Sequence, residues 1–296
     1  MRIIITGATG FIGKHLINLF DKNSVTVLTR GNVQNCQTIN ASLESLLHKQ
    51  CIKNNYDVAI HLAGLAHNSY SLSEFRTINV DSTVALARQL AKNGLKRFIF
   101  ISSIGVNGNK TDTNPFNESS IANPHADYSI SKYEAEIELA KLSNELGFEL
   151  VIIRPPLVYG ENAPGNFKSL YNLANKGVPL PFGLANNSRS FVSVMNLCDF
   201  IALCVIHPMA ANELFLVCDD EVISTKQLIK IIWQAKNINS FLLPIPVFIF
   251  KFLFKILGRS AMSVQLFDNL VVDNSKAKRL LGWSPKLAMT DVFKKL

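Results

Sequence analysis

Short apolar runs alternate with stretches of helical periodicity through the first half of this chain. Each run holds about five residues and is rich in β-branched or aromatic side chains, as in strands buried on both faces of a parallel sheet. The expected strands are Ile3–Ile5, Val25–Leu28, Val58–Leu62, Arg97–Ile101 and Leu150–Ile153, and the expected helices are Phe11–Phe20, Val80–Lys92 and Ser131–Leu146. This alternation predicts the α/β class, with a doubly wound parallel sheet and right-handed crossovers.

The sequence pattern changes after Arg154-Pro155-Pro156, where proline and glycine recur and the alternation of strands and helices is lost. Ser193–Val205 then reads as a return to the larger lobe, with a strand end and an apolar helix. We therefore expect a larger domain over residues 1–160 plus about 191–208. A smaller α+β lobe would occupy residues 161–190 and about 209–296.

The most apolar segment of the chain is 241–258, with the sequence FLLPIPVFIFKFLFKILG. A helix beginning after Pro246 has about twelve residues, roughly 18 Å at 1.5 Å per residue, which is too short to span a bilayer. Lys251 and Lys255 mark one polar face. We expect a helix packed in the core, with a peripheral membrane or protein contact as the alternative.

Composition narrows the partners of the chain. Its 296 residues are 48% hydrophobic, enough for a large buried core, and the net charge of +8 suits an anionic partner. Basic residues are scattered rather than clustered, which argues against nucleic acid. Five cysteines without a C-x-x-C pair fit a reducing cytoplasm, and the apolar run after Met1 is too short for a signal peptide. The histidines lack metal-ligand spacing, so we expect no metal site.

A glycine motif, Gly7-Ala8-Thr9-Gly10-Phe11-Ile12-Gly13, lies between the first strand and the first helix. Glycines at such a turn allow the backbone to approach a pyrophosphate closely. The spacing is G-x-x-G-x-x-G rather than the more common G-x-G-x-x-G. Its position between a strand and a helix predicts a dinucleotide-binding site.

Two further motifs carry reactive side chains. Tyr128 and Lys132 are four residues apart at the start of an expected helix, so both project from one helix face. There the ammonium would favour the phenolate and lower the pKa of Tyr128. Ser102-Ser103 follows the strand Arg97–Ile101, and sites of doubly wound sheets lie at such strand ends. Taken alone, the serine pair would be read as a helix or turn cap.

Together these residues resemble the extended short-chain dehydrogenase/reductase family, and the resemblance runs from Met1 to about Lys295. Its motifs here are the glycine turn, His61-Leu62-Ala63-Gly64, Asn79-Val80, the Ser103, Tyr128 and Lys132 set, and Arg154-Pro155. Val106-Asn107-Gly108, the segment 154–160 and the tail 278–285 point to nucleotide-sugar 4-epimerases and reductases of nucleotide 4-keto-6-deoxysugars from bacterial polysaccharide pathways. The resemblance implies a Rossmann-type fold, a homodimer and a cytoplasmic location.

The resemblance also implies a role for each motif. Tyr128 would be the general acid/base at the sugar oxygen, Lys132 would hold the nicotinamide ribose, and Ser103 would orient the sugar. The implied cofactor contacts are Gly7, Thr9, Gly10, Phe11, Ile12, Gly13, Thr29, Arg30, Leu62, Ala63, Gly64, Asn79, Ile101, Ser102, Tyr128, Lys132, Pro155 and Val158. The implied substrate contacts are Ser103, Tyr128, Asn166, Leu180, Phe182 and Arg189, where the arginine would bind the diphosphate and Leu180 and Phe182 would enclose the base.

The chain departs from the family pattern at the end of the second strand. NAD-using epimerases carry an acidic residue there, whereas this chain has Thr29-Arg30, and an arginine attracts a 2′-phosphate. We therefore expect NADP(H) rather than NAD(H), and a reductase of a nucleotide 4-keto sugar. The alternatives are a UDP-sugar 4-epimerase of the UDP-glucose or UDP-N-acetylglucosamine type and a non-catalytic dinucleotide-binding regulator. Leu157 and Ser193 also differ from galactose-type epimerases, so the sugar stays open. Glu134, Glu136 and Glu138 are expected on a solvated helix face.

Overall fold

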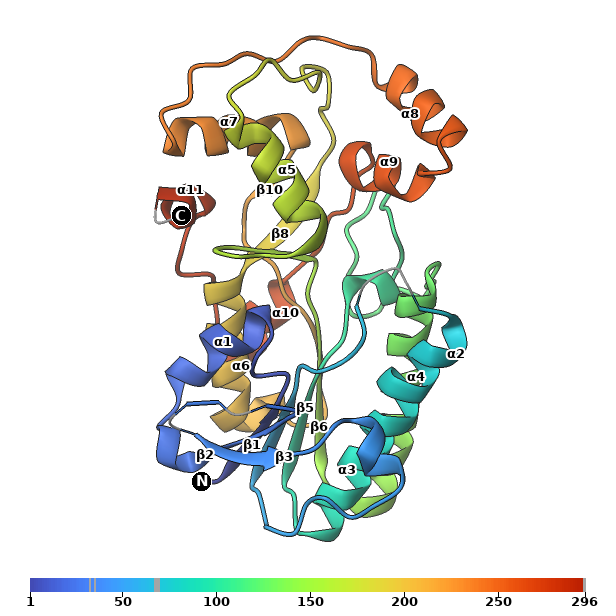
Figure 1. Ribbon diagram of the computed structural model, residues 1–296, viewed down its shortest axis with the longest axis vertical. Helices are drawn as coiled ribbons and strands as arrows, with labels where there is room; N and C mark the ends of the chain where they lie inside the picture. The colour runs from blue at the N-terminus through green and yellow to red at the C-terminus, as the bar shows by residue number, and fades with distance from the viewer. Residues whose placement is uncertain (32, 35, 67–69, 295–296) are drawn as a thin grey trace.

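Seven parallel strands form the sheet of the larger lobe in the computed structural model, which describes residues 1–31, 33–34, 36–66 and 70–294 (Figure 1). The strand order is β3-β2-β1-β4-β5-β6-β9. The doubly wound sheet is therefore confirmed, with β3 and β9 as edge strands that the sequence did not predict. The strands are β1 (Ile3–Thr6), β2 (Val25–Thr29), β3 (Gln37–Asn40), β4 (Val58–His61), β5 (Arg97–Ile101), β6 (Glu149–Arg154) and β9 (Leu214–Leu216).

Helices cover both faces of this sheet (Figure 1). Because side chains alternate along a strand, Ile3 and Ile5 pack on one face and Ile4 on the other. The first face is covered by α1 (Phe11–Leu16) with its extension η1 (Ile17–Leu19), by α6 (Val194–Ile206) and by α10 (Ser275–Leu281). The second face is covered by α3 (Ser82–Lys92) and α4 (Asp127–Leu146). Short elements link these layers: η2 (Lys22–Ser24), η3 (Glu44–Leu47), α2 (Leu72–Phe75), η4 (Arg76–Asp81), η5 (Ile104–Val106) and η6 (Pro208–Ala210).

The smaller lobe is built around a three-stranded sheet with the order β10-β8-β7. Its core is rich in aromatic rings, and the Phe293 ring stacks on both Tyr159 and Phe167. Its elements are β7 (Leu157–Tyr159), α5 (Gly165–Asn175), β8 (Arg189–Ser193), β10 (Val222–Ile223), α7 (Thr225–Ala235), α8 (Val247–Ile256), α9 (Ser260–Phe267) and α11 (Met289–Lys294). Two elements of the range 209–296, β9 and α10, belong to the larger lobe instead, since β9 pairs with β6 and α10 packs on the sheet.

A buried carboxylate joins the two lobes. Asp219 accepts hydrogen bonds from the Tyr159 hydroxyl at 2.8 Å, the Ser193 amide at 3.0 Å and the Asn196 side chain at 2.7 Å. Burial raises the pKa of Asp219 to about 6, although these donors oppose the shift. The network connects β7 and β8 of the smaller lobe to α6, which lies on the larger one.

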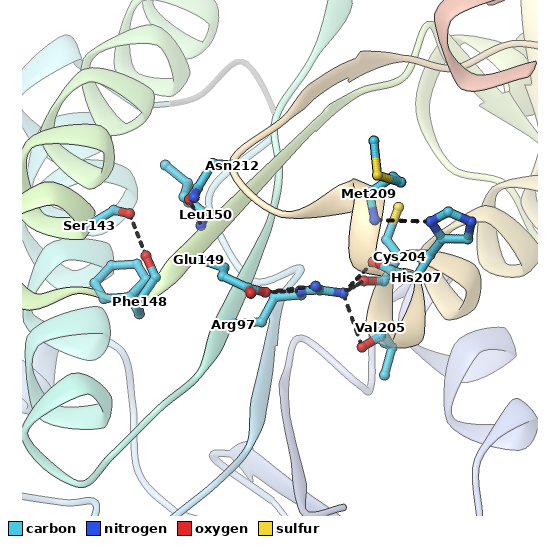
Figure 2. A network of polar contacts seen from close by, with 10 residues as sticks. All are labelled: Arg97, Ser143, Phe148, Glu149, Leu150, Cys204, Val205, His207, Met209 and Asn212. Atoms are coloured by element: carbon cyan, nitrogen blue, oxygen red, sulfur yellow. Dashed lines mark hydrogen bonds and ion pairs between the residues drawn. The ribbon is translucent and has the colours of Figure 1, made fainter. Parts of the chain in front are cut away.

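The carboxyl end of α6 is held by one arginine from the sheet (Figure 2). Arg97 on β5 donates through Nη1 to the carbonyls of Cys204 at 2.6 Å and His207 at 3.0 Å, and its Nε lies 2.7 Å from Glu149. A cation at a helix carboxyl end satisfies carbonyls that have no partner within the helix. Arg97 thereby fastens α6 to the strand that leads to Ser102 and Ser103.

Two sequence expectations need correction. None of the ten residues of α8, all of which the structure describes, is buried, so this helix is not a core helix. The helix has more apolar surface than the smaller lobe beneath it covers, so Phe248 and Phe252 stay exposed. Glu136 is buried rather than solvated, because positions two apart on a helix lie on nearly opposite sides, away from Glu134 and Glu138. Over the described parts of the chain, no helix has the length and apolarity needed to cross a membrane.

Candidate active site

The turn after β1 requires glycine at its first position, Gly7. Gly7 has φ +74°, and a Cβ there would lie 2.7 Å from the backbone nitrogen of Ala63. A Cβ on Gly13 would lie 2.2 Å from the Gly7 carbonyl oxygen, so the first turn of α1 packs directly on the loop. Gly7 therefore packs tightly on the loop after β4, and no larger residue fits there.

A cavity of about 640 Å³ opens over this turn. Eight of the expected cofactor contacts line it: Gly7, Thr9, Gly10, Thr29, Arg30, Leu62, Ala63 and Gly64. The sequence did not predict the rest of the lining, which includes Ser42, Glu44, Tyr70, Ser73 and Thr77. The missed residues around Ser42 and Glu44 follow β3, whose polar sequence QTIN gives no strand signal. The size and glycine floor of the cavity suit a dinucleotide.

The other expected cofactor contacts lie outside the lining of this cavity. One of them, Asn79, has a structural role. Its Oδ1 accepts from the Leu65 amide at 2.8 Å, and its Nδ2 donates to Ser131 Oγ at 3.0 Å. A Cβ on Gly64 would lie 2.8 Å from Asn79 Oδ1. Asn79 therefore fixes the cavity wall at Gly64 against α4. The remaining contacts outside the lining are Phe11, Ile12, Gly13, Ile101, Ser102, Tyr128, Lys132, Pro155 and Val158.

Ser102 and Ser103 stand at the carboxyl end of β5, as the sequence predicts. Ser103 Oγ accepts from the Gly105 amide at 3.1 Å and so caps η5, which leaves its hydroxyl proton to donate. Ser102 Oγ is buried and has no hydrogen-bond partner within the described residues. A buried hydroxyl of this kind is suited to a ligand.

Lys132 lies on α4, one turn after Tyr128, and reaches the end of β5. Its ammonium donates to the Ile101 carbonyl at 2.9 Å and lies 4.5 Å from the centre of the Phe100 ring. Burial lowers the pKa of Lys132 to about 8, while Glu136 opposes the shift. The side chain is still mostly protonated at neutral pH. A Cβ on Gly64 would lie 3.7 Å from Nζ, so the ammonium borders the cavity wall.

The expected lowering of the Tyr128 pKa is wrong for the protein without ligands. Burial raises the pKa of Tyr128 to about 12, because the phenolate would lose its hydration. The Lys132 ammonium is committed to the Ile101 carbonyl and does not offset this effect. The Tyr128 ring packs edge-on against Phe75. The phenol therefore starts as a proton donor.

His61 ends β4 and has a structural role. Its ring nitrogens bond Thr6 Oγ1 at 2.6 Å and Thr83 Oγ1 at 2.9 Å, and the ring stacks on Phe100. Burial lowers the pKa of His61 to about 3, with a smaller contribution from Lys132. The ring is thus neutral, and it links β1, β4 and α3 behind the site.

A second, apolar pocket of about 120 Å³ lies in the smaller lobe. Three expected substrate contacts, Asn166, Phe182 and Arg189, line it together with Leu157. Leu180 is not in the lining. It is buried, and its backbone forms a β-bridge with Leu242. The Ile104 amide, next to Ser103, donates to the Pro155 carbonyl at 3.0 Å, and Leu157 of this pocket follows two residues later.

Arg189 is buried in the wall of this pocket. Its Nη1 donates to the carbonyls of Asp268 at 2.9 Å and Val264 at 3.3 Å. Burial lowers the pKa of Arg189 to about 10, which leaves it charged at neutral pH. The Asn166 amide is hydrogen-bonded to Gln265. Both side chains therefore also hold α9, apart from any contact with a substrate.

Comparison with known proteins matches this architecture to one family. The family model described as "NAD dependent epimerase/dehydratase family" matches residues 3–218. A UDP-glucose 4-epimerase of Vibrio cholerae is 38% identical, over 99% of this chain and 93% of that protein. A dTDP-4-dehydro-6-deoxyglucose reductase of Escherichia coli is 24% identical, over 99% and 96%. The fold is also that of a UDP-glucose 4-epimerase from Thermotoga maritima, with a TM-score of 0.78, 24% identity, and 99% and 96% coverage.

Proposed function

The chain belongs to the NAD dependent epimerase/dehydratase family, and from this premise we propose that it is a 4-epimerase of a UDP-sugar of the UDP-glucose or UDP-N-acetylglucosamine type. The observation that carries the proposal is the intact set of Ser103, Tyr128 and Lys132, of which the Lys132 ammonium borders the cavity wall at Gly64. A second supporting observation is the sequence similarity to a UDP-glucose 4-epimerase, which is 38% identical over nearly the full length of both chains. The sequence favoured the reductase, and this likeness favours the epimerase more.

The residues present fit a nicotinamide dinucleotide. Gly7 and Gly10 line the cavity and carry no side chain that would block a diphosphate, and Ser102 Oγ offers a buried polar atom. Gly7, Gly10 and Ala63 would hold the dinucleotide, and Lys132 would bind its ribose. When bound, the nicotinamide would accept a hydride from C4 of the sugar and return it.

The chemistry left to the protein is proton transfer at the C4 oxygen. Tyr128 would take the hydroxyl proton when the C4 alcohol is oxidised and give it back when the carbonyl is reduced. Ser103, whose hydroxyl proton is available, would donate to the same oxygen and orient it. Because the pKa of Tyr128 is about 12 in the ligand-free protein, its role as a base requires the pKa to fall when the site fills.

A 4-keto sugar reductase is the second candidate, and Arg30 favours it. Arg30 and Thr29 line the cavity, where the guanidinium could bind a 2′-phosphate of NADP(H). Glu44 lines the same cavity and would repel that phosphate. A reductase needs only the proton-donating form of Tyr128, which is the form that the raised pKa favours.

Product analysis separates the two candidates. The protein would be incubated with UDP-glucose or UDP-N-acetylglucosamine and NAD, and the C4 epimer followed by proton NMR. In parallel, NADPH consumption would be followed with a nucleotide 4-keto-6-deoxysugar. Epimer formation without net cofactor consumption, abolished in Tyr128→Phe, supports the epimerase. Stoichiometric NADPH oxidation with no epimer would identify the reductase instead.

A further inference from the structure

The outward face of α8 is an unusually apolar exposed surface. Its exposed fractions are 70% for Phe248, 64% for Phe252, 65% for Ile256 and 66% for Leu257. These residues recur at helical spacing and form one continuous stripe, which we call the α8 face. The helix lies at the outer end of the smaller lobe, away from the large sheet (Figure 1). Such a stripe on a protein surface marks an interaction site.

The opposite side of α8 fixes the helix to the lobe. Val247, Phe250 and Phe254 pack against the smaller-lobe core, and the Phe250 ring stacks on Phe182 and Phe267. Lys251 pairs with Asp268 at 2.6 Å, which adds a second attachment. The α8 face is therefore a rigid part of the folded protein and is presented outward.

The sequence around the α8 face is rich in basic residues, although Lys251 on α8 is paired with Asp268. No aspartate or glutamate occurs between Val222 and Phe267, and the stretch 162–198 has none either. The chain's positive net charge is concentrated in these stretches, whose basic residues are Lys168, Lys176, Arg189, Lys226, Lys230, Lys236, Lys251, Lys255 and Arg259. Lys251 and Lys255 lie beside the apolar stripe on the helix itself. The lobe that carries this stripe is thus complementary to an anionic surface.

We propose that the α8 face docks in the plane of an anionic phospholipid membrane. A short helix with phenylalanine and leucine on one face and lysine at its flank has the pattern of an interfacial helix. At ten residues and about 1.5 Å per residue, α8 is too short to span the bilayer, so it lies on the membrane. A second copy of the chain would bring the same basic residues, Lys255 and Arg259 among them, to the other side of the contact and so repel the first.

Docking would bring the smaller-lobe pocket close to the membrane. α8 packs on α9, and Met262, Gln265 and Leu266 of α9 line the pocket that also contains Arg189. The docked enzyme would therefore bind its substrate near the lipid surface. The inference rests on the surface alone and is independent of the reaction proposed above.

Vesicle sedimentation tests the proposal with the full chain and without substrate. The protein should sediment with vesicles of phosphatidylcholine mixed with phosphatidylglycerol, more than with phosphatidylcholine alone, and less at high salt. The double variant Phe248→Ser/Phe252→Ser should lose roughly tenfold or more in partitioning. Lys255→Gln/Arg259→Gln should lose roughly fivefold per residue.

A matched control uses exposed apolar residues of the larger lobe. Ile206 and Met209 are 69% and 54% exposed, so Ile206→Ser/Met209→Ser removes similar surface far from α8 and should bind vesicles as the wild type does. Circular dichroism would verify that all variants fold. The proposal is overturned if Phe248→Ser/Phe252→Ser binds like the wild type. It is also overturned if that variant instead turns a dimer into a monomer in analytical ultracentrifugation while the wild type ignores vesicles.

Discussion

The Arg154 guanidinium donates to both carboxylate oxygens of Glu136, with Nε 2.9 Å from Oε1, and both residues are buried. Glu136 lies one turn after Lys132 on α4, and Arg154 ends β6 just before Pro155. Arg154 also donates to Asn107 at 3.0 Å, next to η5 and the serine pair. This ion pair therefore fixes the helix that carries Tyr128 and Lys132 relative to the strand ends around Ser103.

Breaking this pair on one side should destabilise the fold strongly. Glu136→Leu or Arg154→Met alone leaves a buried charge unpaired, and we expect each to lower the free energy of unfolding by about 3–5 kcal/mol. The double variant removes both charges and should lose far less than the sum. Urea unfolding of the four proteins measures the cycle. Single variants that cost less than about 1 kcal/mol would show that the pair is solvated.

The local motifs of the site could be predicted because each depends on few neighbouring residues. The glycine turn, the strand end at Ser103 and the Tyr128–Lys132 spacing are set by the backbone of one strand, one loop or one helix. The burial of Glu136 and the place of Glu44 in the cavity lining were not predicted, because both depend on residues that are distant in the sequence. β3 and β9 were missed because one is polar and the other has only three residues. The apolar pattern of α8 predicted a helix, but it could not show that nothing within the described chain covers its outer side.

Folding stability should fall in acid partly through His61. The unfolded chain binds a proton on this histidine near pH 6.5, whereas the folded protein binds it only near pH 3. The free energy of unfolding therefore decreases as the pH falls through this window, by at most about 1.4 kcal/mol per unit. Urea unfolding above and below pH 6.5 should show a shallower pH dependence in His61→Phe than in wild type. Equal slopes would mean that His61 is protonated in the fold.

The Tyr128 phenol should stay protonated at neutral pH when no ligand is bound. Its pKa is raised to about 12, so the ionised fraction at pH 10, the ordinary pKa of tyrosine, is small. Ultraviolet difference titration of wild type against Tyr128→Phe isolates this phenol from the other tyrosines. We expect no phenolate signal from Tyr128 up to pH 10. A phenolate near neutral pH that disappears in Tyr128→Phe would show that Lys132 dominates over burial.

Arg30 and Glu44 should have opposite effects on cofactor choice. If Arg30 binds a 2′-phosphate, Arg30→Ala lowers NADP(H) affinity by roughly tenfold or more and changes NAD(H) affinity little. Glu44→Gln, the matched change at an acidic residue of the same cavity, should raise NADP(H) affinity because a repulsion is removed. Fluorescence titration of wild type and both variants with NADPH and with NADH gives the six affinities. Unchanged NADP(H) binding in Arg30→Ala would place its side chain in solvent.

In the proposed 4-epimerase, hydride leaves C4 and returns to the same carbon, while Tyr128 moves the proton. The most direct measurement uses UDP-glucose, or UDP-N-acetylglucosamine, with deuterium at C4, and follows the product by NMR. We predict a C4 epimer that keeps its deuterium at C4, formed roughly 10²- to 10⁴-fold more slowly by Tyr128→Phe. Loss of the deuterium to solvent would rule out hydride return to C4, and an unchanged rate in Tyr128→Phe would rule out Tyr128 as the acid/base.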